Sequence, residues 1–262
     1  MSAPTAIPAL SLVLPTYNER ANLPRLVPRL VQVLERARCE FELIIVDDDS
    51  PDRTWELAAG MAATDARLRV VRRQGERGLA TAVVAGWKVA RGDVLGVMDA
   101  DLQYPPEGLP DLLRPIQDGA ADVVVASRYA PGAKLAGWSV RRELISQSAI
   151  RIARLALPRA LGHLADPNSG YFLLRRSVIE NVDLRPIGFK ILIEVLARGW
   201  PARVVERPYP YQGRKVGASK LGWWQSMQFI SHLARLAWDT GPLTRRSRSL
   251  RARVTGSSSE AK

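Results

Sequence analysis

The chain has 262 residues, and 47% of them are hydrophobic, which is enough for the core of one large α/β domain and argues against general disorder. Its single cysteine, Cys39, excludes an internal disulfide framework, and with only two histidines a structural zinc site is not expected. The net charge of +12 predicts an anionic partner: a nucleic acid, an acidic membrane surface or a phosphorylated substrate. Because no RNA-binding aromatic motif or zinc-finger spacing is present, we expect no nucleic acid partner.

Strands and helices are predicted to alternate along the first half of the chain. Apolar runs predict strands at residues 10–14, 41–50, 67–73, 93–101 and 122–129. Helical spacing of apolar residues predicts helices at 19–38, 52–63, 78–90 and 106–119. Short links between strands and helices are typical of a parallel sheet that is covered by helices on both faces.

Polar residues follow four of these predicted strands. They occupy residues 15–17, 47–49, 99–101 and 127–129. The carboxyl ends of parallel strands meet at one edge of a sheet, and ligands bind beyond that edge. The four polar ends therefore predict a cleft.

The second half of the chain is less regular. We expect a helix at 139–157 with arginines on one side, a strand at 170–178 that leads into a helix, and a helix at 189–199. A strand at 202–211 precedes a basic, glycine-containing loop at 213–222.

Two aspartates end the predicted fourth strand, in the sequence GDVLGVMDADLQYPPE. In an extended chain Asp99 and Asp101 would point to the same face, and two converging carboxylates repel each other. A divalent metal would relieve that repulsion. Three more acids, residues 47–49, follow the second strand, and we expect one of them to bind a base or ribose while the others cap a helix or bind a basic side chain.

The C-terminal segment predicts an amphipathic helix over residues 220–239. Its polar residues fall at spacings of three and four, and tryptophans lie on its apolar face. Two interpretations remain open: the helix packs on the core, or it lies in a membrane interface, where indole rings are enriched.

We expect a catalytic domain at 1–220, an interface helix at 221–240 and a basic disordered tail at 241–262. No secretory signal and no apolar stretch of roughly 18–20 residues is found, so we expect a cytoplasmic protein, peripheral on the cytoplasmic face of a membrane.

The motifs together resemble a known family. VLPTYNERANL, IIVDDDSPDRTWE, MDADLQYPPE, ASRY, RPIGFKILIEVL and the late SKL loop resemble the family 2 glycosyltransferases with a GT-A fold, and among them the dolichyl-phosphate (polyprenyl-phosphate) mannose synthases. The resemblance covers roughly residues 9–222. It implies a Rossmann-like, mostly parallel central sheet and an inverting transfer of mannose from GDP-mannose to a polyprenyl or dolichyl phosphate, with Mg²⁺ or Mn²⁺ as cofactor.

The resemblance also implies roles for individual residues. The nucleotide-binding positions are Pro15, Tyr17, Glu19, Val46 and Asp48. The metal and diphosphate-sugar positions are Asp99, Ala100, Asp101 and Gln103, with Asp101 and Gln103 as direct metal ligands. The acceptor-phosphate positions are Arg128, Arg142 and Ser146, and Lys190, Arg214 and Lys220 bind the donor. Asp99, Asp101 and Arg128 are the catalytic candidates.

The chemistry suits these residue types. A hard divalent cation with oxygen ligands stabilises the charge that builds on a departing nucleoside diphosphate. The acceptor phosphate is already ionised near neutral pH, so no dedicated general base is required, and cations must instead hold two anions together. His163 and His232 are therefore expected to be structural.

The sequence departs from the family at two points. Tyr104 stands where the family often has His, and Ala218 stands where Glu is common. Some relatives carry membrane spans after the catalytic domain, whereas here the late helix, the tail or a membrane-anchoring partner would have to provide anchorage.

Other functions remain open. A polyprenyl-phosphate glucose synthase that uses UDP-glucose would share nearly every motif. A processive polysaccharide synthase is disfavoured because Gln-x-x-Arg-Trp is absent. A non-enzymatic basic module that binds a membrane or nucleic acid would leave the carboxylates at the strand ends unexplained.

Overall fold

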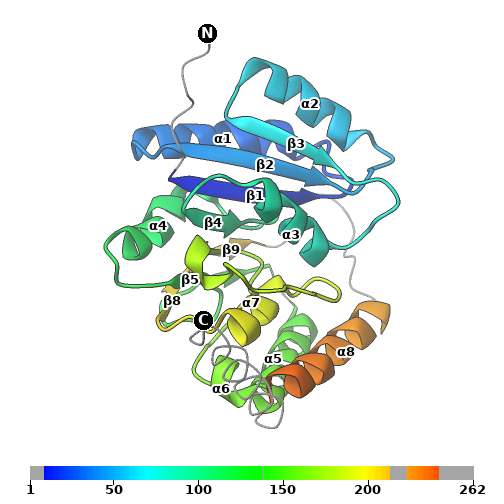
Figure 1. Ribbon diagram of the computed structural model, residues 1–262, viewed down its shortest axis with the longest axis vertical. Helices are drawn as coiled ribbons and strands as arrows, with labels where there is room; N and C mark the ends of the chain where they lie inside the picture. The colour runs from blue at the N-terminus through cyan, green and yellow to red at the C-terminus, as the bar shows by residue number, and fades with distance from the viewer. Residues whose placement is uncertain (1–8, 138, 213–222, 242–262) are drawn as a thin grey trace, which may run out of the picture.

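A seven-stranded sheet forms the centre of the computed structural model, which describes residues 9–137, 139–212 and 223–241 (Figure 1). The strand order is β3-β2-β1-β4-β7-β5-β8. The strands are β1 (Leu10–Thr16), β2 (Phe41–Asp47), β3 (Leu68–Arg72), β4 (Val94–Val97), β5 (Val123–Ser127), β7 (Phe172–Arg175) and β8 (Val204–Pro208). Neighbouring strands are parallel except that β7 runs antiparallel to both β4 and β5. A separate parallel pair joins β6 (Leu135–Ala136) to β9 (Tyr211–Gln212).

Helices cover both faces of this sheet. They are α1 (Leu23–Arg36), α2 (Thr54–Thr64), α3 (Leu79–Val89), α4 (Leu109–Gln117), α5 (Val140–Ala156), α6 (Pro158–Leu161), α7 (Ile191–Gly199) and α8 (Trp223–Thr240), with short 3₁₀ turns η1 (Pro106–Gly108) and η2 (Arg176–Val178). In Figure 1, α2 lies beyond the β3 edge, and α5, α6 and α8 gather at the opposite end.

Alternation along the strands divides the core in two. Leu12 and Leu14 of β1 pack in one cluster with Leu26 of α1, whereas Val13 between them packs in the other with Val83 of α3. The first cluster also contains side chains of α2 and α4, and the second contains side chains of α5, α6, α7 and α8. Period-two patterning thus gives each face of the sheet its own layer of helices.

The predicted elements occur in the predicted order, the short β6 and α6 were not predicted, and several boundaries and one strand direction differ. The predicted strand 93–101 ends at Val97, where its pairing with Val13 of β1 stops, and Leu102 has a left-handed φ of 61°. Asp99 and Asp101 therefore lie on a bent segment and not on an extended strand. The predicted strand 202–211 is divided into β8 and β9, and β7 is antiparallel, a direction that an apolar run does not reveal.

The pattern of α8 differs from the predicted division into a polar face and an apolar face. His232, placed in the polar stripe, is 1% exposed, and its Nε2 lies 2.7 Å from Oε2 of the fully buried Glu194 on α7. Phe229 and Leu233 are buried beside it, while Trp223 and Trp238 are exposed. The buried face is mixed because the carboxylate of Glu194 requires a polar partner there. His232 is thus structural, as predicted.

None of the helices in the described ranges combines the length and the hydropathy that crossing a membrane requires.

Candidate active site

The ends of β1 and β2 bring the first predicted site residues together. Pro15 pairs in register with Val46, and both are buried. Tyr17 follows β1 directly and is half-buried, with the guanidinium of Arg77 over its ring at 4.6 Å from the centroid. An aromatic ring beside a cation at a strand end is suited to contact a nucleotide.

Glu19 lies in the turn between β1 and α1. Its N–H donates to Oγ1 of Thr54 at 3.0 Å, and its carboxylate accepts from the Asn22 side chain at 2.5 Å. Glu19 therefore joins the first turn of the site to the start of α2.

The three acids after β2 have three different environments. Asp47 is fully buried and accepts hydrogen bonds from the side chains of Thr16 and Ser50, so it fixes the turn. Asp49 pairs with Arg72 at 2.5 Å. The pair between Asp49 and Arg72 is of the kind expected for an acid that binds a basic side chain, whereas Asp47 binds two hydroxyl groups.

Asp48, the acid predicted to bind the nucleotide, is held in place on both of its oxygens. Oδ1 lies 2.6 Å from Nη2 of Arg73 in a buried ion pair, and Oδ2 accepts from the N–H of Gly78 at 2.8 Å. Arg73 also donates to Oγ1 of Thr81 at 3.0 Å and to the carbonyl oxygen of Gly78 at 3.0 Å. Arg73 thus fixes Asp48 against the start of α3.

The acidic turn after β4 is shaped by close packing. Asp99 is partly buried, and Ala100 and Asp101 are buried. A Cβ added to Gly170 would lie 2.3 Å from Oδ2 of Asp99, so the backbone of residue 170 approaches the carboxylate too closely for a side chain. The glycine at position 170, just before β7, thereby leaves room for the Asp99 carboxylate.

Asp101 and Gln103 provide the oxygen atoms that suit a hard cation. Oδ1 of Asp101 accepts from the Gln103 N–H at 3.2 Å, and Oε1 of Gln103 accepts from the Tyr211 hydroxyl at 2.6 Å. A carboxylate and an oriented amide oxygen fit Mg²⁺ or Mn²⁺. No group of three His, Cys, Asp or Glu side chains in the described part of the chain could hold a metal alone. Substrate oxygens and water would have to supply the remaining ligands.

Four tyrosines pack around this turn. Tyr104 makes edge-to-face contacts with Tyr171 at 5.4 Å and with Tyr211 at 5.0 Å between ring centroids, and Tyr209 adjoins the cluster. Burial raises the pKa values of Tyr104 and Tyr211, so both hydroxyls stay protonated. Tyr104, the departure from the family pattern, is therefore a core residue that packs the 99–103 turn against Tyr171, directly before β7, and Tyr211 of β9.

Arg128, at the end of β5, forms a buried ion pair. Its Nε and Nη2 each lie 2.7 Å from a carboxylate oxygen of Asp166, which is fully buried, and its backbone N–H also donates to Asp166. Burial alone would lower the pKa of Arg128, but Asp166 outweighs that effect and raises it, so the guanidinium remains charged. A bidentate contact of this kind fixes the plane of the guanidinium.

Lys190 precedes α7 and reaches the same region. Its Nζ donates to the carbonyl oxygen of Asn168 at 2.7 Å. Burial, and then the positive charge of Arg128, lowers the pKa of Lys190 to about 8, whereas Asp99 acts in the opposite direction. Lys190 therefore lies within electrostatic reach of both the acidic turn and Arg128.

Helix α5 carries the other two predicted acceptor residues toward the site. Arg142 is close enough to Tyr211 to affect the pKa of that hydroxyl, and Ser146 likewise affects the pKa of Tyr129. Arg214 and Lys220 fall in 213–222, outside the described residues, as does the predicted tail beyond residue 241.

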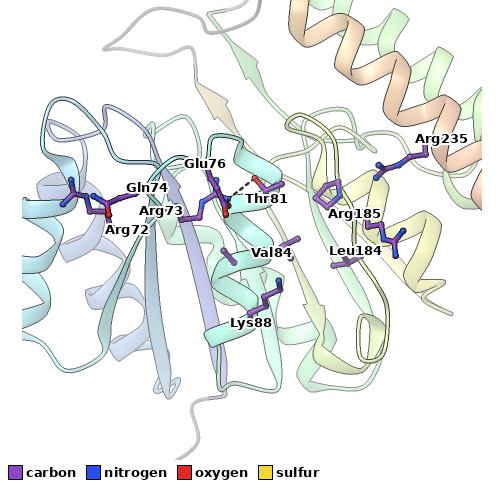
Figure 2. Close-up of a pocket in the computed structure, with 12 residues that line it drawn as sticks. Arg72, Arg73, Gln74, Glu76, Thr81, Val84, Lys88, Leu184, Arg185 and Arg235 are labelled. Atoms are coloured by element: carbon purple, nitrogen blue, oxygen red, sulfur yellow. Dashed lines mark hydrogen bonds and ion pairs between the residues drawn. The ribbon is translucent and has the colours of Figure 1, made fainter.

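A groove of about 590 Å³ lies outside this cluster, along the outer face of α3 (Figure 2). Its lining is basic, but Arg72 is paired with Asp49, and Arg73 is paired with Asp48. Figure 2 shows Arg235 of α8 facing the groove from the side opposite Arg73. The groove touches the predicted site through Arg73, and we assign it no substrate.

Three site-forming residues were missed from sequence. Arg73 and Asp166 complete buried ion pairs with Asp48 and Arg128, and Tyr211 binds Gln103. Each partner is distant along the chain, so no local pattern links the pairs. The cluster DPNSG at 166–170, a polar turn directly before an apolar strand, was the available signal for Asp166.

This fold and site define a glycosyltransferase. The chain belongs to glycosyl transferase family 2, whose model matches residues 11–183. Within that family it groups with the dolichol-phosphate mannosyltransferases. It is 44% identical over 236 residues to the dolichol-phosphate mannosyltransferase of Pyrococcus furiosus, covering 90% of this chain and 66% of that protein. It is 36% identical over 237 residues to the enzyme of the same name from Saccharomyces cerevisiae, covering 86% of each.

A solved structure supports the fold. Glucosyl-3-phosphoglycerate synthase from Mycobacterium tuberculosis, crystallised with Mn²⁺, uridine diphosphate and glucosyl-3-phosphoglycerate, matches with a TM-score of 0.66 and 21% identity. The match covers 88% of this chain and 80% of that one. At this identity the likeness concerns architecture alone, and it places this chain among α/β folds of GT-A type.

Proposed function

We propose that this protein transfers mannose from GDP-mannose to a polyprenyl or dolichyl phosphate with inversion, producing polyprenyl-phosphate mannose and GDP. Family membership and the names of its relatives support a nucleotide-sugar donor and a lipid-phosphate acceptor. The observation that carries the proposal is the position of the 99–103 turn beside two cations, the buried Arg128 and the partly buried Lys190. Such a site can bind two phosphorylated groups next to each other.

The donor would be held by the acidic turn and the ends of β1 and β2. Asp101 and Gln103 would hold Mg²⁺ or Mn²⁺, which when bound stabilises the negative charge on the departing diphosphate. Asp48, fixed by Arg73, would bind the base or ribose, and Tyr17 would contact the nucleotide. Asp99 would bind the sugar, because Gly170 leaves its carboxylate at the centre of the turn.

The acceptor would approach from the side of α5. Its phosphate is ionised near neutral pH and can attack the anomeric carbon without first losing a proton. Arg128, Arg142 and Lys190 would offset the repulsion between this phosphate and the donor diphosphate. Asp166 keeps the plane of Arg128 fixed, and Ser146 would add a hydroxyl donor.

We propose a peripheral position on the cytoplasmic face of a membrane, and the exposed side chains of helices α5 and α8 support the membrane contact. The two helices contact each other, and apart from Trp200 the large hydrophobic side chains that are exposed in the described ranges lie on them. Leu155 is 82% exposed, and Trp238 is 78% exposed. Arg141 and Arg151 of α5 are also exposed and would meet anionic head groups.

Vesicle sedimentation tests this membrane contact. We expect Trp224→Ser to reduce co-sedimentation with anionic phospholipid vesicles, because the side chain is 59% exposed on α8 and would lose its interfacial position. Trp200→Asn is the matched control, since Trp200 is an exposed tryptophan that belongs to neither helix and its φ of 48° suits asparagine. Equal sedimentation of the Trp224→Ser variant and the native protein would contradict the assignment.

Lipid extraction after incubation with radiolabelled donor tests the reaction itself. With Mn²⁺ and a polyprenyl phosphate, we expect label from GDP-mannose to enter the lipid phase, and Asp101→Ala to abolish this while the protein stays folded. Transfer from UDP-glucose in place of GDP-mannose would overturn the choice of donor. Full activity of the Asp101→Ala variant would overturn the role of the turn.

A further inference from the structure

The candidate metal ligand Gln103 is tied to a residue 108 positions away. The Tyr211 hydroxyl on β9 donates to Oε1 of Gln103 at 2.6 Å, and both side chains are only 5% exposed. The backbone of Gln103 is tied as well, because its N–H donates to Oδ1 of Asp101. Gln103 is thus held at its side-chain oxygen and at its backbone N–H.

Tyr211 is itself well fixed. Its N–H donates to the carbonyl oxygen of Lys134 at 2.9 Å, and β9 pairs with β6. Its ring packs against Tyr104 at an interplanar angle of 78°, and the Arg128 guanidinium lies 5.6 Å from the ring centroid. Arg128 is anchored in turn by Asp166. The hydroxyl therefore has little freedom to leave Gln103.

An amide oxygen has two acceptor positions, so it can accept a hydrogen bond and coordinate a cation at the same time. A hydrogen bond to a metal ligand from outside the coordination shell fixes the orientation of that ligand, and losing it typically weakens metal binding about 10–100-fold. The Tyr211 hydroxyl also determines which end of the amide faces it, since the oxygen must accept.

We propose that Tyr211 is a positioning residue for the divalent cation, acting through Oε1 of Gln103. The inference rests on the proposed metal role of Asp101 and Gln103 and adds the residue that orients the neutral ligand. The ring contact between Tyr104, directly after the 99–103 turn, and Tyr211 of β9 also holds these two segments together.

Titration of Mn²⁺ into the protein in the presence of saturating GDP tests the proposal, with bound Mn²⁺ followed by electron paramagnetic resonance. We expect Tyr211→Phe, which keeps the ring and removes the hydroxyl, to weaken Mn²⁺ binding about tenfold. Binding of GDP without metal should not change. Tyr209→Phe is the matched control: it removes a hydroxyl of the same cluster that donates to the carbonyl oxygen of Pro105, and it should leave the Mn²⁺ affinity within about twofold of native.

The double variant separates this role from general loosening of the cluster. If Tyr211 acts through Gln103, adding Tyr211→Phe to Gln103→Ala should weaken Mn²⁺ binding no further. Additive losses, or an unchanged affinity of Tyr211→Phe alone, would overturn the proposal. The Asp101→Ala variant tests the proposed metal site separately from the role of Tyr211. A native Mn²⁺ affinity in that variant would show that the cation does not bind at this turn, whatever the result for Tyr211→Phe.

Discussion

Gly170→Ala tests the position of the Asp99 carboxylate without altering Asp99. The added Cβ would lie 2.3 Å from Oδ2 and 3.0 Å from Cγ, whereas ordinary contact begins at 3.4 Å. The carboxylate must therefore move by about 1 Å, a displacement that can reduce the rate of a positioned reaction about 10²-fold. The backbone at Gly170 is outside the left-handed region, so alanine adds no conformational strain there.

The fold should tolerate this change, because the atoms displaced belong to the end of a side chain. We expect the free energy of unfolding to fall by no more than about 1–3 kcal/mol, the range for overpacking. The assay is kcat/KM for mannose transfer, alongside urea unfolding. Gly60→Ala, in the middle of α2 with nothing within 4 Å, is the control and should gain up to about 1 kcal/mol with native activity. Native activity in a folded Gly170→Ala variant would refute the reasoning.

Two further predictions concern the cations Arg128 and Lys190. Asp166→Asn should destabilise the protein by about 3–5 kcal/mol in urea unfolding, because it leaves Arg128 buried without its counter-charge. Asp183→Asn, which breaks an exposed pair, should leave the free energy of unfolding nearly unchanged, and equal losses in the two variants would contradict the argument. The apparent affinity for polyprenyl phosphate should fall as the pH rises through about 8, where free Lys190 loses its proton. Lys190→Arg should remove that inflection, and an identical pH profile in the variant would exclude Lys190 as its source.

Much of the fold could be predicted because it depends on local patterns. The alternating apolar residues of β1, such as Leu12 and Val13, and the helical spacing in α1 are set by their near neighbours in sequence. The end of β4 at Val97 was missed because strand length depends on pairing with β1, which no local pattern records. The direction of β7 was missed for the same reason.

The site residues likewise fall into those that local patterns predicted and those that depend on distant partners. The carboxylates at the strand ends were found because like charges after an apolar run are locally unusual, and Asp49 has a basic partner as predicted, whereas Asp47 binds the hydroxyls of Thr16 and Ser50 instead. Arg73, Asp166 and Tyr211 were not found, since each acquires its meaning from a partner that only the folded chain brings near. The mixed face of α8 was missed because burial of His232 depends on a carboxylate of α7.

The central claim is that a cation at the 99–103 turn holds the donor diphosphate beside Arg128 and Lys190. A crystal soaked with GDP-mannose and Mn²⁺, measured at the manganese absorption edge, tests it most directly. We predict an anomalous peak within bonding distance of Asp101 and Oε1 of Gln103, with the diphosphate on the metal. A nucleotide bound elsewhere, with no peak at this turn, would contradict the claim.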